Sequence, residues 1–194
     1  MTHEGDSTIN NKEYILNNGT FTNNGYILNE DSIINTGTGT FKHLDNQFNN
    51  QGVFKNVLAT SILQIDSTMT VSGALGKIVN NGIIKVLTNG FLNYSSTKFT
   101  NKYEVYNYGV SIFDSVLNDY TGGSGTAKLY NYNSLRFNGR FENKRGTLIN
   151  YGLNASNNDG QDLTGIQGNI IIDNNTSTNI ENINKSPSIL TNYG

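Results

Sequence analysis

The chain has 194 residues, a net charge of −2, one proline and neither cysteine nor tryptophan, a length that suits one domain or at most two. It contains 34 asparagines and 21 glycines but only 4 alanines, a mixture poor in helix formers and rich in turn residues. This composition argues against a helical protein and excludes a disulfide framework, a zinc ribbon and thiol catalysis. Many large aliphatic and aromatic residues remain, so the chain can bury a core and is not a disordered polar tract.

Short segments that contain Asn and Gly recur along the chain, and an alternating apolar pair follows each one. Such segments lie at 17–29, where two occur in tandem, and at 49–56, 80–85, 138–143 and 145–152. In the first third of the chain, large apolar residues follow one another every six or seven residues. That step is too short for the hairpins of a β-sandwich, which we keep as a third, weaker interpretation.

Every third large apolar residue returns to an equivalent position, with a period of about 21 residues. Three columns result, and we expect their members to form the core. The columns are Phe21, Phe41, Ile62 and Ile83; Ile27, Phe48, Met69, Phe91 and Ile112; and Ile34, Phe54 and Leu75.

Three columns with one period predict a coil of three short strands joined at Asn/Gly corners. A single coil cannot bury its apolar residues, but stacked coils align like residues and pair each strand in parallel with its equivalents. Corner asparagines can form amide ladders and tolerate left-handed backbone geometry, as glycine does. The sequence therefore predicts an all-β, single-domain, right-handed parallel β-helix (β-solenoid) with three short faces and about nine coils, roughly 43 Å long.

We divide the chain into an N-terminal tail at 1–7, the solenoid at 8–173 and a C-terminal polar segment at 174–194 that caps the rod or contacts a neighbour. Loops rich in Gly or Asn at 119–126 and 154–160 are expected to interrupt the later coils.

The tandem of Asn-Gly repeats at 17–29 and its relatives resemble repeats of bacterial haemagglutinin-like adhesins, autotransporter passenger domains and phage tail-spike or fibre β-helices. The likeness extends over about residues 8–152 and concerns composition and fold class. It implies a rigid, elongated protein on the surface of a cell or virion that serves adhesion or assembly. It brings no catalytic residues with it.

Few residues of the sequence suggest a catalytic, metal or cofactor site. With only His3 and His43 as histidines, we expect no catalytic histidine, no metal site and no cofactor, and we expect that the protein is not an enzyme. The alternative is a carbohydrate-binding or carbohydrate-cleaving β-helix of the tail-spike type, because such enzymes use paired carboxylates. Its candidate residues are Asp114 and Asp119 as acids, Tyr106 and Tyr120 as sugar-stacking rings, and Arg136 and Arg140 as charge partners.

Eight of the eleven tyrosines lie in the mildly basic middle of the chain. Tyrosines on the outside of a rod suit contacts with glycans or with another rod, whereas inward tyrosines would fill the core, and the sequence does not separate these alternatives. Together with Arg136 and Arg140, the candidate interface residues are Tyr94, Tyr103, Tyr106, Tyr108, Tyr120, Tyr130, Tyr132 and Tyr151.

The open ends of a solenoid are sets of unpaired strand edges, which favours the chain itself as partner, in a homo-oligomer or filament. Because both terminal blocks are acidic and the middle is basic, staggered side-by-side contact is an alternative to stacking end to end. Glycans are a second candidate partner. Neither nucleic acid binding nor membrane insertion is expected, and we predict an extracellular or cell or virion surface location, although no signal peptide is visible.

Overall fold

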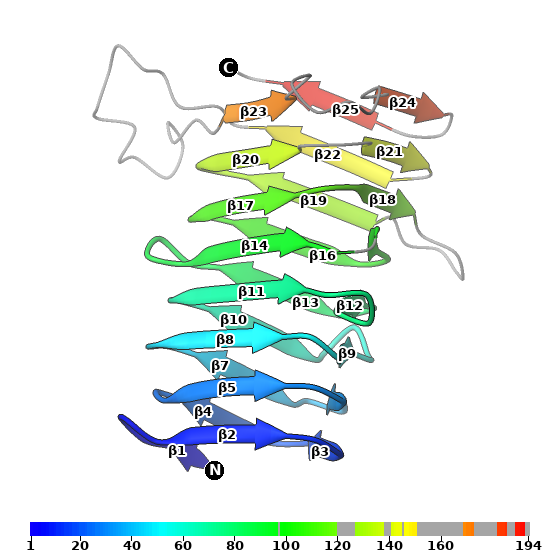
Figure 1. Cartoon of the computed structure of the whole chain (residues 1–194). Helices are drawn as coiled ribbons and strands as arrows, with labels where there is room; N and C mark the ends of the chain where they lie inside the picture. Colours follow the sequence, from blue (N-terminus) through cyan, green and yellow to red (C-terminus); the bar gives the residue numbers. More distant parts are fainter. Residues whose placement is uncertain are drawn as a thin grey trace.

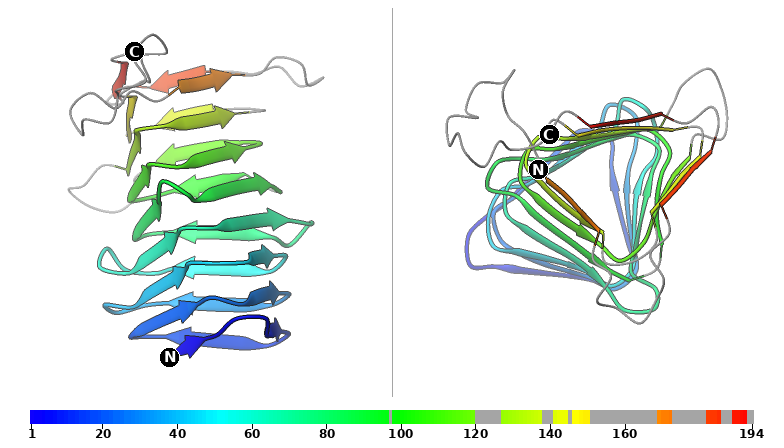
Figure 2. Two further views of the ribbon diagram at one scale, coloured as in Figure 1. Left: turned by 90° about the vertical axis from the view of Figure 1, so that its left-hand side faces the viewer. Right: turned by 90° about the horizontal axis from the view of Figure 1, so that it is seen from above.

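In the computed structural model the chain winds into a β-solenoid with three parallel sheets, and no helix occurs among the described residues. The structure describes residues 1–96, 98–119 and 127–137 and, beyond these, the strands at 141–144, 146–150, 169–172, 182–185 and 189–192. Seen along its axis, the rod has a triangular outline (Figure 2). From the N-terminal end upward, the near strands run to the right and the far strands return to the left, a right-handed winding (Figure 1).

Sheet A comprises β1 (Thr2–His3), β4 (Thr20–Asn23), β7 (Thr40–His43), β10 (Ile62–Ile65), β13 (Ile83–Val86), β16 (Glu104–Asn107), β19 (Ala127–Asn131), β22 (Gly146–Asn150) and β25 (Ile189–Asn192). Sheet B comprises β2 (Thr8–Asn11), β5 (Tyr26–Asn29), β8 (Gln47–Asn50), β11 (Thr68–Ser72), β14 (Phe91–Ser95), β17 (Val110–Phe113), β20 (Ser134–Phe137) and β23 (Asn169–Ile172). Sheet C comprises β3 (Tyr14–Asn17), β6 (Ser32–Asn35), β9 (Val53–Asn56), β12 (Lys77–Asn80), β15 (Phe99–Asn101), β18 (Val116–Asp119), β21 (Phe141–Lys144) and β24 (Asn182–Lys185).

Each strand pairs in parallel with its equivalents one coil before and one coil after. Equivalent residues lie about 21 positions apart, as in the sheet A column Phe21, Phe41, Leu63 and Ile84, with steps of 20, 22 and 21. The predicted parallel β-solenoid with three short faces is therefore confirmed. Strand β1 lies within the segment 1–7, and strands β24 and β25 lie within the segment 174–194.

The core is a stack of apolar layers, and half of the residues predicted for the three columns are correct. Phe21, Phe41, Ile27, Phe48, Met69 and Phe54 are all buried, as expected. Six other predicted members are wrong: Ile62, Ile83, Phe91, Ile112 and Ile34 are half-buried with outward side chains, and Leu75 is exposed in a corner loop. Their places are taken by Leu63, Ile84, Leu92, Ser111, Ile33 and Ile78.

Five of the six errors share one cause, a shift of one residue within the strand, whereas Leu75 lies in the corner loop before β12. Successive side chains of a strand point to opposite faces, so a shift by one moves the wrong residue into the core. In Ile83–Val86, for example, Ile84 and Val86 are buried while Ile83 and Lys85 face outward. Because Ile83 and Ile84 are equally apolar, they do not indicate which face of the strand is buried. The polar Lys85 does, since it shares the outward face with Ile83.

Corner geometry depends on glycine more than on asparagine. Among the described residues only Asn46 combines a side chain with positive φ, at 59°, beside Gly5, Gly37 and Gly73. Asn46 is thus the described corner asparagine that uses the left-handed geometry which asparagine tolerates. Gly52 has a different role, because a Cβ there would collide with the backbone carbonyl of Asp31 in the preceding coil.

The asparagines that end many strands point inward and form the predicted amide ladders. The longest runs along sheet C through Asn17, Asn35, Asn56, Asn80, Asn101 and Asn118, with Nδ2 to Oδ1 distances of 2.8 to 3.1 Å. In every rung Nδ2 of one coil donates to Oδ1 of the next coil toward the C-terminus. The ladders therefore have a direction, and they supply hydrogen bonds for polar groups that burial would otherwise leave unpaired.

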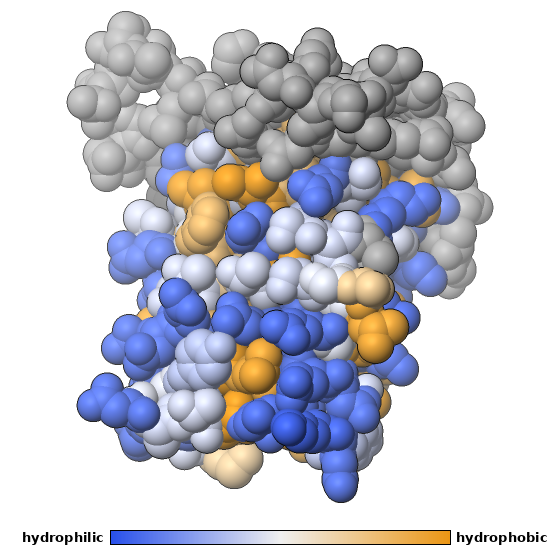
Figure 3. Space-filling model, viewed as in Figure 1, coloured by the Kyte–Doolittle hydropathy of each residue, from blue (hydrophilic) through white to orange (hydrophobic). Residues whose placement is uncertain are grey.

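The outer surface of sheet B is mostly polar over its first coils, and apolar side chains gather farther up the rod (Figure 3). In this sheet Phe91 of β14 lies beside Val110 of β17, and both are half-buried.

Candidate functional site

The outer face of sheet A carries the densest set of outward aromatic residues among the described side chains. In β16, Val105 and Asn107 point inward, so Glu104 and Tyr106 point outward. In β19 the same alternation turns Lys128 and Tyr130 outward. Parallel register places Lys128 beside Glu104 and Tyr130 beside Tyr106.

Two more tyrosines extend the set into the next corner. Tyr108 and Tyr132 follow the ladder asparagines Asn107 and Asn131, whose side chains are joined at 2.7 Å. Backbone N–H groups of Tyr108 and Tyr132 still donate to the coil below, at 2.7 and 2.8 Å. The ladder and these bonds hold the two tyrosines at equivalent positions in successive coils, one above the other.

The rings of Tyr106, Tyr108, Tyr130 and Tyr132, named here the tyrosine array, form two stacks. Tyr106 and Tyr130 have centroids 4.9 Å apart and planes inclined by 11°, and Tyr108 and Tyr132 are 4.6 Å apart at 12°. Rings within one coil lie 6.5 Å apart. The stacking distances match the spacing of about 4.8 Å between strands, so strand pairing sets the ring separation.

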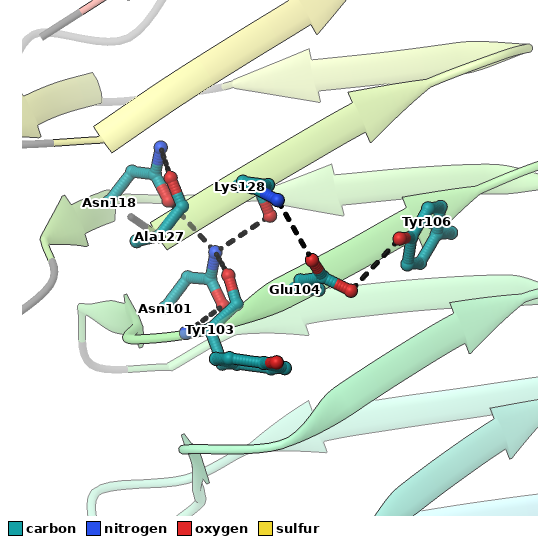
Figure 4. Close-up of polar contacts among 7 residues, drawn as sticks. All are labelled: Asn101, Tyr103, Glu104, Tyr106, Asn118, Ala127 and Lys128. Atoms are coloured by element: carbon teal, nitrogen blue, oxygen red, sulfur yellow. Dashed lines mark hydrogen bonds and ion pairs between the residues drawn. The ribbon is translucent and has the colours of Figure 1, made fainter. Parts of the chain in front are cut away.

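A charged group adjoins the first stack. Glu104 accepts hydrogen bonds from the Tyr106 hydroxyl at 2.9 Å and from Lys128 Nζ at 3.2 Å (Figure 4). The hydrogen bond to Glu104 raises the pKa of Lys128. Partial burial and the same carboxylate raise the pKa of Tyr106, so its phenol stays protonated at neutral pH.

The structure brings together only part of the predicted interface. Tyr94 is fully buried and fills the core between Phe99 and Phe113, whereas Tyr103 is half-buried in the corner before β16. Tyr120, Tyr151 and Arg140 lie outside the described residues. Arg136 occupies an outward register position of β20, opposite Ile112, and its side chain lies outside the described set.

The two candidate acids do not occupy facing positions on adjacent coils. Asp114 lies in the corner before β18, and Asp119 is the last residue of that strand and is buried. Both residues therefore belong to one coil, whereas the paired carboxylates of a β-helix glycosidase are expected on one face of adjacent coils. Among the described residues no group of three His, Asp or Glu side chains is placed to hold a metal ion.

Sequence reasoning missed Glu104 and Lys128 as partners of the tyrosines. The signal is present, because each precedes a tyrosine by two residues and therefore shares its face of the strand. The 24 residues that separate them differ from the 21-residue period, and this obscured the relation.

Each stack of two rings covers one face of each ring. The array therefore presents adjacent phenols beside a carboxylate that accepts a hydrogen bond from one of them.

Comparisons with family models, with curated proteins and with solved structures find no match to this chain. Within the described part of the chain, no helix is long and apolar enough to cross a membrane.

Proposed function

We propose that this chain is a non-enzymatic structural rod that assembles end to end into a filament or fibre outside the cell or on a cell or virion surface. The observation that carries the proposal is the open end formed by the first coil.

Among the described residues, nothing covers the apolar layer of the first coil. Ile9 and Ile15 pack on the core but are only partly buried, whereas the residues above them, Ile27 and Ile33, are completely buried. An exposed core layer next to unpaired strand edges favours association with another edge.

The ladders end at the same place with free acceptors. Nδ2 of Asn11 and of Asn17 donates to the coil above, and no donor among the described residues reaches either Oδ1. These two asparagines expose 6% and 8% of their surface, whereas Asn29 and Asn35 above them expose none. Because ladder direction is fixed, a second rod that continues the ladder must approach with its Nδ2 end.

The C-terminal strand of sheet C has the register that such continuation requires, because the ladder position of Asn17 runs on from Asn118 to Asn143 and Asn184. In sheet B the position of Asn11 is taken by Phe137 and Ile172 at the C-terminal end, so the match concerns the sheet C ladder alone. We therefore assign the C-terminal end of a second copy as the occupant of the first coil's open end.

The test is electron microscopy of the purified chain over a concentration series, together with light scattering. We expect unbranched filaments one rod wide that lengthen with concentration. Ile9→Lys combined with Ile15→Lys places charges at the open end and should leave separate rods. Leu75→Lys, at a residue that is 73% exposed and far from both ends, is the matched control and should assemble like the parent.

Separate rods of the parent at all concentrations would contradict the proposal. Bundles of staggered rods that the Ile9/Ile15 variant still forms would instead support side-by-side assembly and equally overturn end-to-end contact.

A further inference from the structure

We propose that the tyrosine array is a site of oxidative cross-linking, at which Tyr106 and Tyr130, and likewise Tyr108 and Tyr132, become joined as dityrosine within one chain. The product is a covalent clamp between two successive coils. The inference does not depend on filament assembly, because both partners of each pair belong to the same rod.

Ring geometry favours coupling within each stack. Dityrosine forms by a bond between the ring carbons adjacent to the phenol oxygens. The near-parallel rings have centroids only 4.9 and 4.6 Å apart, so small ring movements can bring these carbons into bonding contact. The four side chains are half-buried at the surface, so an external oxidant can reach them and the rings can close the remaining gap.

The chemistry needs a one-electron oxidant, for which we name a peroxidase acting with hydrogen peroxide. Each phenol loses one electron and its hydroxyl proton, and the two radicals join through a carbon–carbon bond. The proton on each newly bonded carbon then moves to the phenol oxygen and restores the aromatic ring. In sum two hydrogen atoms leave the pair, and one peroxide is reduced to two water molecules.

Glu104 favours oxidation of the Tyr106–Tyr130 pair. Its carboxylate already accepts the Tyr106 hydroxyl proton in a 2.9 Å hydrogen bond, so the proton can leave together with the electron. Lys128 at 3.2 Å holds the carboxylate in place. Glu104 is thus a positioning and proton-accepting residue for the Tyr106–Tyr130 pair.

The experiment treats the dilute full chain with horseradish peroxidase and hydrogen peroxide, followed by trypsin and mass spectrometry. Cleavage after Lys102, Lys128 and Arg136 separates peptide 103–128 from peptide 129–136. We expect these peptides to remain joined, with a mass lower than their sum by two hydrogens and with dityrosine fluorescence. The joined peptide should not form when the chain is oxidised in denaturant.

Phenylalanine variants separate the pairs. Tyr106→Phe should leave only the Tyr108–Tyr132 link, Tyr108→Phe only the other, and the double variant should reduce the joined peptide to the level of the sample without peroxide. Tyr14→Phe is the control, because Tyr14 is 56% exposed and has no ring partner among the described residues. Glu104→Gln should lower the ratio of the first link to the second without lowering the second.

Two results would overturn the proposal. One is dityrosine that arises mainly between chains or at Tyr14, as random oxidation by exposure would produce. The other is a joined peptide that the double variant still yields. An unchanged ratio in the Glu104 variant would remove the role assigned to that carboxylate.

Discussion

At the scale of single residues, His43 shows how a ladder position tolerates a different side chain. It is fully buried in a place that asparagine occupies in the adjoining coil. Nδ1 accepts from Asn23 Nδ2 at 2.9 Å, and Nε2 donates to the carbonyl of Thr68 at 2.9 Å. The neutral imidazole thereby reproduces both bonds of an amide rung, which a protonated ring could not do.

This arrangement predicts that stability falls in mild acid. Burial lowers the pKa of His43 below its usual 6.5. Below about pH 6.5 this histidine therefore binds a proton in the unfolded chain but not in the folded chain. Stability is then lost by up to about 1.4 kcal/mol per pH unit until the folded pKa is reached. His43→Asn should remove this loss, and urea unfolding of both proteins between about pH 7.5 and 5.5 measures it.

His3 and all the carboxylates are present in both proteins, so the difference between parent and variant isolates His43. Equal slopes for the two proteins over that interval would show that His43 is not held neutral.

At the scale of elements, the ladder corner fixes how each four-residue strand lies. An inward asparagine ends most strands of sheet C, and an apolar residue two positions earlier also points inward. The asparagine therefore sets both the face of the strand that is buried and the height of the next corner.

Replacing one ladder amide by its isosteric acid tests this role. Asn56 accepts from Asn35 and donates to Asn80 Oδ1 at 3.1 Å and to the Ile83 carbonyl at 2.9 Å. In Asn56→Asp an oxygen replaces the donor, faces two acceptors and carries a buried charge, so we expect a loss of about 3 kcal/mol or more. Chemical denaturation measures it, with Asn93→Asp as an outward control that should change stability by less than about 0.5 kcal/mol.

A similar stability for the two acidic variants would mean that the ladder bonds contribute little to the fold.

The fold class could be predicted from the sequence because three columns of apolar residues, one for each face of the coil, share the same period. The inward face could not be predicted at every strand, since pairs such as Ile33 and Ile34 satisfy either alternative. The candidate site was half predicted: the cluster of tyrosines is visible in the sequence, but stacking depends on register across corners of unequal length. Tyr94 illustrates the limit, because composition does not distinguish it from the outward tyrosines, yet it fills the core.

At the scale of the whole molecule, stability is a chain of contacts between neighbouring coils, since each strand pairs only with the coil before and the coil after. A defect in one layer should therefore weaken both adjoining layers. Phe48 is the clearest residue at which to test this, because its ring packs against those of Phe41 and Phe54, with centroids 5.6 and 6.1 Å away.

Phe48→Asp places an unpaired charge among these rings and should unfold the rod, with a loss above about 4 kcal/mol. Leu75→Asp is the control, because Leu75 lies in an exposed corner loop and should tolerate the change. Thermal unfolding followed by circular dichroism distinguishes them. A melting temperature for Phe48→Asp within about 2 °C of the parent would place Phe48 outside the core.

The repeated register of the sheet C ladder also has a consequence for how such a chain can vary. In sheet C each junction between coils joins asparagine to asparagine and one apolar residue to another, so one junction of this sheet resembles the next. Gain or loss of one whole turn, about 21 residues, preserves the sheet C ladder and changes the rod by about 4.8 Å. The solenoid is in this sense a molecular ruler whose graduation is the single turn.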